Sequence, residues 1–92
     1  GPLVRSIGRR AFSGCFCLTA LDLPRALRTI GANAFNSCNS LSEVSLPDRV
    51  GTVGSGAFAH CRQLATLSAA RGTRLSAAGV AKGTRVRAIR WR

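Results

Sequence analysis

The sequence repeats with a period of 23 residues, and this period limits the possible folds more than any other feature. Three copies follow one another, at residues 7–29, 30–52 and 53–70, and the third copy is incomplete. The positions that recur at this spacing are mostly apolar. They are Ile7/Ile30/Val53, Gly8/Gly31/Gly54, Ala11/Ala34/Ala57, Phe12/Phe35/Phe58, Cys15/Cys38/Cys61, Leu18/Leu41/Leu64 and Leu21/Val44/Leu67. A fixed period of this length predicts a solenoid, in which each unit buries its apolar face against its neighbours.

Within each unit the apolar spacing changes halfway. Residues 11–18 carry apolar side chains at i, i+1, i+4 and i+7, which predicts a short helical turn with one buried side. The next stretch, LTALDLP, alternates, and so does LSEVSLP in the second unit, which predicts a short strand. Pro24 and Pro47 end these strands because proline has no N–H for the ladder. Stacking then predicts an α/β solenoid with parallel strands on one face and helical turns on the other.

Residues 71–92 depart from the repeat. We expect them to form a degenerate fourth unit that caps the stack, since terminal repeats are commonly atypical. A two-residue insertion would align Leu75 with Leu27 and Val86 with Cys38. The chain is therefore predicted to be one domain, residues 1–92, of three repeats and a C-terminal cap.

The consensus IGxxAFxxCxxLxxLxLPxxLxx resembles the BspA-like leucine-rich repeats, which carry a cysteine in a 23-residue unit. The resemblance covers about residues 4–70. It implies an arc-shaped or ladder-like solenoid, and it implies roles in adhesion and protein binding, often at the surface of bacteria and protists. The family has no shared catalytic residues, so the resemblance transfers none to this chain.

The four cysteines predict no metal site, because they lack the close paired spacing of zinc ligands. We expect Cys15, Cys38 and Cys61 to stack as small buried groups with free thiols. Free thiols favour a reducing compartment, whereas the family resemblance is compatible with a cell surface. No cofactor is predicted. No apolar run is long enough to span a membrane.

Catalysis is not expected. The chain has one histidine and three acids, with Asp22 in the first unit, Glu43 and Asp48 in the second and His60 in the third. Asp22 and Glu43 are predicted to face outward on neighbouring strands, where a carboxylate pair could act in acid–base chemistry. Solvated charges on a sheet face are the commoner case, and we therefore predict that the protein is not an enzyme.

The outward positions of the predicted sheet are small, polar and slightly acidic, which suits a peptide or protein partner that carries Lys or Arg. A plain solvated face would look the same. The positions of this candidate protein-binding face are Ala20, Asp22, Glu43, Ser45, Thr66 and Ser68.

The net charge of +11 is concentrated elsewhere, since residues 71–92 contain seven basic residues and no acid. Such a segment could contact RNA, with an aromatic ring stacked on a base, or it could contact an acidic protein. A charged edge that prevents end-to-end stacking would explain the same residues. The candidate anion or RNA contacts are Arg71, Arg74, Arg85, Arg87, Arg90, Trp91 and Arg92.

The first unit has no polar cap on its N-terminal side, so we expect either that more repeats precede Gly1 in the native chain or that another molecule covers this apolar edge. We name Leu3, Val4 and Phe16 as candidate end contacts, through which the chain could self-associate or meet a partner. The sequence thus predicts a non-catalytic protein-interaction or structural module. The alternative is a basic accessory subunit of a larger assembly, holding RNA or an acidic protein through its C-terminal segment.

Overall fold

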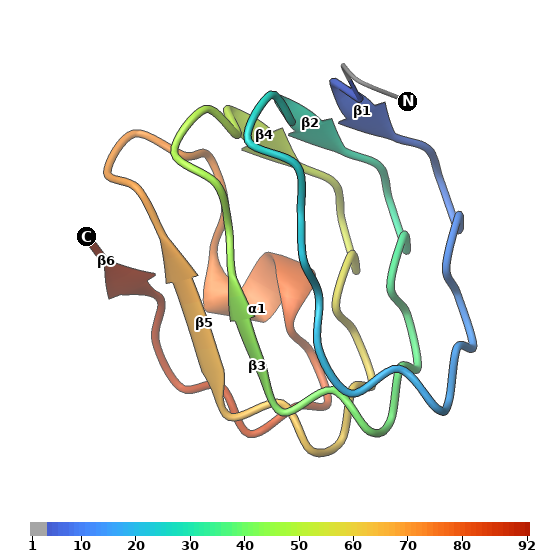
Figure 1. The fold of residues 1–92 in the computed structure, drawn as a ribbon. Helices are drawn as coiled ribbons and strands as arrows, with labels where there is room; N and C mark the ends of the chain where they lie inside the picture. Colours follow the sequence, from blue (N-terminus) through green and yellow to red (C-terminus); the bar gives the residue numbers. More distant parts are fainter. Residues whose placement is uncertain (1–3) are drawn as a thin grey trace.

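The computed structural model of the chain describes residues 4–92 and shows a coil of stacked units (Figure 1). One parallel sheet contains β1 (Ser6–Ile7), β2 (Thr29–Ile30) and β4 (Thr52–Val53), in the order β1-β2-β4. Its register pairs residues one repeat apart, with Ser6 opposite Thr29 and Thr29 opposite Thr52. The 23-residue period of the sequence is therefore the length of one complete coil.

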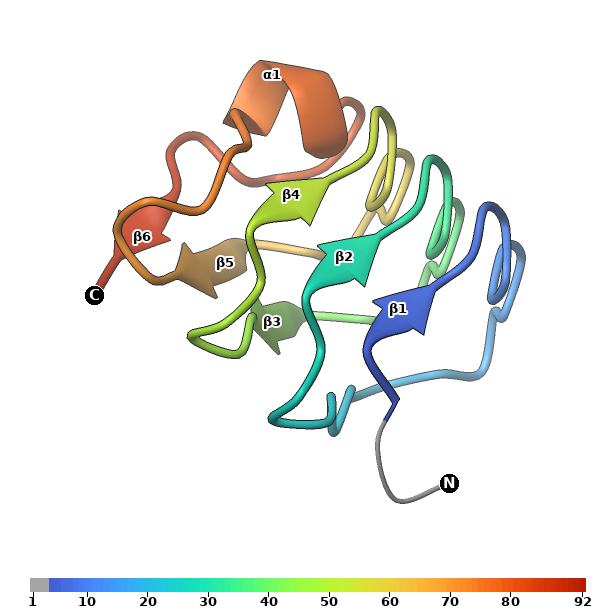
Figure 2. The same cartoon turned by 90° about the horizontal axis from the view of Figure 1, so that it is seen from above.

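The alternating LxL segments form a second parallel sheet, with the order β3-β5-β6. It contains β3 (Glu43–Ser45), β5 (Thr66–Ala69) and β6 (Arg90–Trp91). The corresponding residues 20–22 of the first unit are not a strand. Figure 2, seen from above, shows the strands of the two sheets as two separate rows. The sequence predicted one sheet, but the structure contains two parallel sheets. The additional sheet forms because a second short extended segment of each unit, such as Thr29–Ile30, pairs with the equivalent segments of the neighbouring units.

The predicted helical turns are chains of tight turns instead. Within the first unit the N–H of Ala11 donates to Gly8 and that of Ser13 to Arg10, while the N–H of Phe12 donates to Ala34 of the next unit. The backbone therefore alternates between bonds within the unit and bonds to the next unit. This alternation needs left-handed residues at fixed positions, namely Arg10, Asn33 and Gly56 in one column and Gly14, Ser37 and His60 in another. A helix cannot form through them, since left-handed residues interrupt it.

The core lies between the sheets and the turns, and it is built from the repeated columns. Phe12, Phe35 and Phe58 stack in a ladder, with ring centroids 5.3 Å apart at each step. The second and third units supply most of the buried residues, because each has a neighbour on both sides. The fully buried large side chains are Phe35, Phe58, Leu27, Leu41, Leu46, Leu64, Leu67, Cys38 and Cys61.

Glycine is required where two units approach most closely. A methyl group on Gly31 would lie 2.6 Å from the backbone nitrogen of Arg9, and one on Gly54 would lie 2.3 Å from that of Ala32. Both distances are far below van der Waals contact. The glycine column therefore allows the backbone of each unit to rest on the preceding one.

Residues 71–92 do form a fourth coil, but the predicted two-residue insertion is wrong. The hydroxyl of Thr73 donates to the carbonyl of Val50, and the N–H of Phe58 donates to Val80, at offsets of 23 and 22 residues. The same N–H bond spans 22 residues in the regular units, from Phe12 to Ala34, so both bonds keep the 23-residue repeat. The strand register then shortens by one residue, since Ser68 pairs with Arg90, 22 residues on. Leu75 and Val86 therefore do not occupy the columns of Leu27 and Cys38. A short helix, α1 (Ala77–Val80), replaces the tight turns here.

Candidate functional site

The outer face of β3, β5 and β6, which we call the B face, holds the positions predicted to bind protein. Glu43 and Ser45 on β3 are exposed, and Thr66 and Ser68 on β5 are half-buried. Their neighbours along each strand point inward, as the buried Val44 and Leu67 show. Ala20 and Asp22 of the first unit are exposed as well, but they come from a segment that is not a strand.

Two hollows on the B face bring these positions together. The smaller, of about 280 Å³, is lined by Ala20, Leu21, Glu43, Val44, Ser45, Thr66, Ser68 and Arg90. The larger, of about 610 Å³, is lined by Leu21, Asp22, Leu23, Arg25, Ser45, Leu46, Pro47, Asp48, Arg49 and Arg92. Each of the six predicted positions therefore lines one or both hollows, and Ser45 is shared between them.

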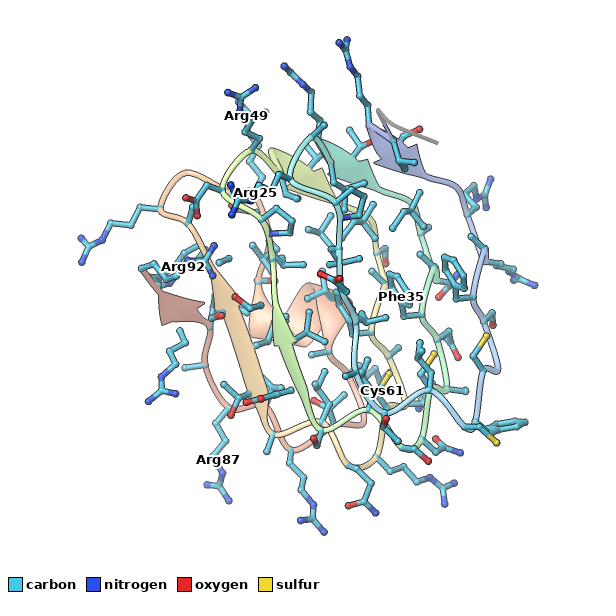
Figure 3. The ribbon with its side chains drawn as sticks, viewed as in Figure 1. Arg25, Phe35, Arg49, Cys61, Arg87 and Arg92 are labelled. Atoms are coloured by element: carbon cyan, nitrogen blue, oxygen red, sulfur yellow. The ribbon has the colours of Figure 1, made fainter. Side chains whose placement is uncertain are left out.

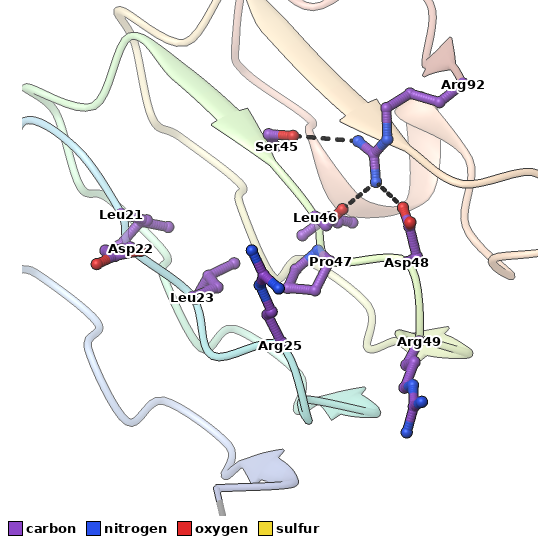
Figure 4. A pocket seen from close by; sticks show the side chains of 10 residues that line it. All are labelled: Leu21, Asp22, Leu23, Arg25, Ser45, Leu46, Pro47, Asp48, Arg49 and Arg92. Atoms are coloured by element: carbon purple, nitrogen blue, oxygen red, sulfur yellow. Dashed lines mark hydrogen bonds and ion pairs between the residues drawn. The ribbon is translucent and has the colours of Figure 1, made fainter.

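The larger hollow contains the side chain of Arg92, which reaches back from the fourth unit (Figure 4). Its Nη1 donates to the hydroxyls of Ser45 and Ser68, at 3.1 Å each. Its Nη2 donates to the carbonyl of Leu46 and lies 2.9 Å from Oδ1 of Asp48. The side chain of Arg92 thus extends from the end of β6 over β5 to the end of β3. Its guanidinium forms the one ion pair found within residues 4–92.

Sequence reasoning missed Asp48, Arg25 and Arg49 as parts of this hollow. In the second unit an acid follows the proline, where the first unit has Arg25 after Pro24. That break in the repeat was the available signal. Figure 4 shows that Arg25 lies beside Pro47. Figures 3 and 4 show that Arg49 points away from Arg92.

The structure divides the seven predicted anion contacts among several places. Arg71 and Trp91 line a third hollow of about 360 Å³ together with Gly72. Arg74 lies beside the other sheet, where it bridges to Thr52. Arg85 and Arg87 are exposed on the segment before β6. Arg90 and Arg92 line the hollows of the B face instead.

The first described unit exposes large apolar side chains, including two of the three residues named as candidate end contacts. Val4 is 37% exposed and Phe16 is 58% exposed, whereas Leu3 lies outside the described residues. Phe12, which the sequence suggested was core, is 44% exposed. Its ring stacks on Phe35 on one side only, since the first described unit has no neighbour beyond it.

The cysteine column is a ladder of free thiols. The thiol of Cys38 donates to the carbonyl of Phe12 at 3.3 Å, and that of Cys61 donates to the carbonyl of Phe35 at 3.1 Å. Burial raises the pKa of the Cys38 thiol, and it raises the pKa of the Cys61 thiol to about 11. These thiols are therefore protonated structural groups at neutral pH, whereas Cys17 is exposed.

Asp22 and Glu43 line two different hollows of the B face. Asp22 lines the larger hollow and Glu43 the smaller one, and they belong to different columns of the repeat. Among residues 4–92, no group of three or more His, Cys, Asp or Glu side chains is arranged to hold a metal ion. Within the same range, no helix has the length and apolar character needed to cross a bilayer.

Comparison with known proteins agrees with this architecture. A family model described as the BspA type leucine-rich repeat region (6 copies) matches residues 3–80. The chain belongs to the BspA type leucine-rich repeat family. Repeats of this class generally serve as protein-interaction or structural modules, and no catalytic family is indicated.

Two solved structures resemble the chain. The leucine-rich repeat protein of T. pallidum is 43% identical, with a TM-score of 0.69, over 71% of this chain and 30% of that protein. A leucine-rich repeat protein from Bacteroides ovatus is 30% identical, with a TM-score of 0.67, over 79% of this chain and 24% of that one. The chain thus spans less than a third of either protein. The search of curated proteins found no match.

Proposed function

We propose that the chain is a non-catalytic protein-interaction module and that the B face is its binding surface. The observation that carries this proposal is the coincidence of two adjoining hollows with small polar side chains on one sheet face. Small side chains leave the strands accessible to an extended segment, and hydroxyls supply hydrogen bonds to it. A rigid scaffold of paired strands beneath the face keeps these groups in place.

The B face carries all three acids of the protein, and it carries arginines as well. Asp22 and Glu43 are exposed there and Asp48 lines the larger hollow. The arginines that line the two hollows are Arg25, Arg49, Arg90 and Arg92. A basic side chain of the partner meets acids only at this face, and the basic residues elsewhere repel it. The charges therefore favour a partner segment that places a single basic side chain beside these acids.

Selection from a displayed library of random peptides tests the proposal. The full chain is used as bait, and each selected peptide is then measured against the variant Thr66→Arg, which places a long charged side chain on the B face. The control is Ser55→Arg, which makes the same change at an exposed position in the turns of the third unit. We expect Thr66→Arg to lower the affinity at least about 10-fold while Ser55→Arg leaves it unchanged, since a blocked site loses more than 1.4 kcal/mol. Equal effects of both variants would contradict the proposal.

A second candidate is the basic accessory subunit, supported by the hollow in which Trp91 lies beside Arg71. Trp91 is 44% exposed and available for stacking on a base. Phosphate contacts release counterions, so the logarithm of RNA affinity should fall by about 0.7 per contact for each tenfold rise in salt. Binding of a single-stranded RNA that is insensitive to salt, or absent at low salt, would exclude this candidate.

The exposed apolar side chains of the first described unit support a third contact, in which two copies of this chain associate through Val4, Phe12 and Phe16. Light scattering at low and high salt measures this directly. An apolar contact gives a dimer at both salt concentrations, and Phe16→Ser should convert it to a monomer. If the protein is monomeric at all protein and salt concentrations measured, self-association is excluded.

A further inference from the structure

We infer that the larger hollow of the B face is a receptor for an arginine side chain of the partner, and that Arg92 is an internal occupant which the partner's arginine displaces. This inference rests on the proposed function, because it names the ligand group that the same face would take. Three observations support the inference. They are the hydrogen-bond acceptors around the Arg92 guanidinium, the solvent exposure of the Arg92 side chain, and the charged residues that would line the hollow without Arg92.

The acceptors match the fork of a guanidinium group. Ser45 and Ser68 accept from Nη1, while the carbonyl of Leu46 and the carboxylate of Asp48 accept from Nη2. A guanidinium presents its N–H groups in one plane, so it can satisfy these acceptors together. A lysine ammonium is a single point with no fixed fork, and it would reach fewer of them.

The receptor is built by the second and third units and not by the unit that carries Arg92. Ser45 and Ser68 are held opposite each other by the ladder between β3 and β5. The backbone of Leu46 is fixed by its own N–H, which donates to the carbonyl of Ser68 at 2.9 Å. The acceptors therefore stay in position whether or not Arg92 is present.

Arg92 is held in a way that permits exchange. Its side chain is 37% exposed and that of Asp48 is 82% exposed. Ion pairs so open to water contribute little net stability, because both charges remain well solvated when separated. The Arg92 backbone is tied by one bond from its N–H to the carbonyl of Ala69, at the end of the two-residue strand β6. Withdrawal of the side chain leaves the stacked units intact.

The charges of the hollow define what should flank the incoming arginine. Without Arg92, its walls carry Asp22 and Asp48 together with Arg25 and Arg49. The guanidinium of the ligand would pair with Asp48, while Arg25 and Arg49 would repel a second cation and attract a carboxylate. The ligand is therefore an extended segment with one arginine between acidic residues.

A titration of the full chain with short arginine probes tests this receptor. The probes are the blocked tripeptide Asp-Arg-Asp and its counterparts with lysine or citrulline at the centre. Binding is followed by the backbone amide resonances of Ser45, Leu46, Asp48 and Ser68. The variants are Arg92→Ala, which removes the occupant, and the double variant Arg92→Ala with Asp48→Asn. The control is Arg87→Ala, which removes an equal charge from an exposed position of the same unit.

We expect Arg92→Ala to bind the arginine probe about 10-fold more tightly than the wild type, which corresponds to an occupant present about nine-tenths of the time. The lysine and citrulline probes should bind this variant at least about 5-fold more weakly, and the Asp48→Asn change should abolish the gain. Equal affinity of Arg92→Ala, Arg87→Ala and the wild type would overturn the inference. So would resonance changes confined to residues outside the hollow.

Failure of the receptor and failure of the proposed function give different results. If selected peptides bind the B face but Arg92→Ala leaves their affinity unchanged, Arg92 is a structural strap only and the receptor is refuted. If no peptide is sensitive to Thr66→Arg, the proposed function fails whatever the arginine probe does. The probe titration then decides the receptor independently.

Discussion

The rings of Phe35 and Phe58 lie nearly parallel, with their centroids 5.3 Å apart and 4° between their planes. Phe12 continues the stack on the other side of Phe35 at the same spacing. In the fourth unit the ladder stops, because Ala81, 23 residues after Phe58, occupies that place and is itself buried. Within residues 4–92 the ladder therefore ends at a buried alanine on one side and at the half-exposed ring of Phe12 on the other.

Replacement of the ring at different levels of the ladder should have unequal costs. Phe58→Ala removes a fully buried ring and should lower the free energy of unfolding by about 3–5 kcal/mol. Phe12→Ala removes a ring that is 44% exposed, and we expect at most half that loss. Urea denaturation of both variants measures the difference. An equal loss would mean that another molecule covers Phe12 in solution.

The glycine column offers a matched comparison. Gly54→Ala forces a methyl group into the backbone of Ala32, and we expect a loss of at least about 1–3 kcal/mol from the resulting strain. Gly8→Ala should change stability by less than about 1 kcal/mol, because no atom of the described residues lies within 4 Å of the added methyl group. Thermal unfolding of the pair tests this. A neutral Gly54→Ala would contradict the close approach of the units.

Stability should fall at alkaline pH because of the buried thiols. The pKa of Cys61 is raised from 9.0 to about 11, so between these values the unfolded chain loses a proton that the folded chain retains. The contribution is complete below pH 9 and is lost as pH rises through 11. Cys38 acts in the same direction. Urea denaturation with reductant at about pH 8 and pH 10.5 measures the fall, which should be smaller in Cys61→Ala. A Cys61→Ala variant with an unchanged pH dependence would exclude this cause.

We predict that residues 71–92 close the stack. Val80 is 2% exposed and its carbonyl accepts the N–H of Phe58 at 2.8 Å. Val80→Asp buries an unpaired charge there and should cost at least about 3 kcal/mol. Ala78→Asp, at an exposed position of the same short helix, should cost much less. Equal and small losses would show that the fourth unit is not part of the cooperative core.

The repeated columns made the solenoid and most of its core predictable, since their residues face inward in each unit by necessity. The turns were not predictable in detail. Apolar spacing at i, i+1, i+4 and i+7 is shared by a helix and by chained tight turns, and what separates them here is left-handed residues such as Arg10, Asn33 and His60. Glycine marks this conformation in only one unit of each column, at Gly56 and Gly14, and the other units carry non-glycine residues there.

The register of the fourth unit and the larger hollow escaped sequence reasoning for a related reason. Thr73 stands where the repeat has Val50, and its hydroxyl is satisfied by the Val50 carbonyl, so a polar residue conceals the true register. Without that register, β6 cannot be placed beside β5. The contact of Arg92 with Asp48 depends on this placement, and no pattern within one unit contains it.

Chemical-shift mapping of a library-selected peptide on the full chain is the most direct test of the central claim. If the B face is the binding surface, the largest amide shift changes will fall on Glu43, Ser45, Thr66 and Ser68, with Asp48 beside them. Changes concentrated on Arg71, Arg85 and Arg87, or on the N-terminal edge around Phe16, would contradict the account and would place the interaction elsewhere.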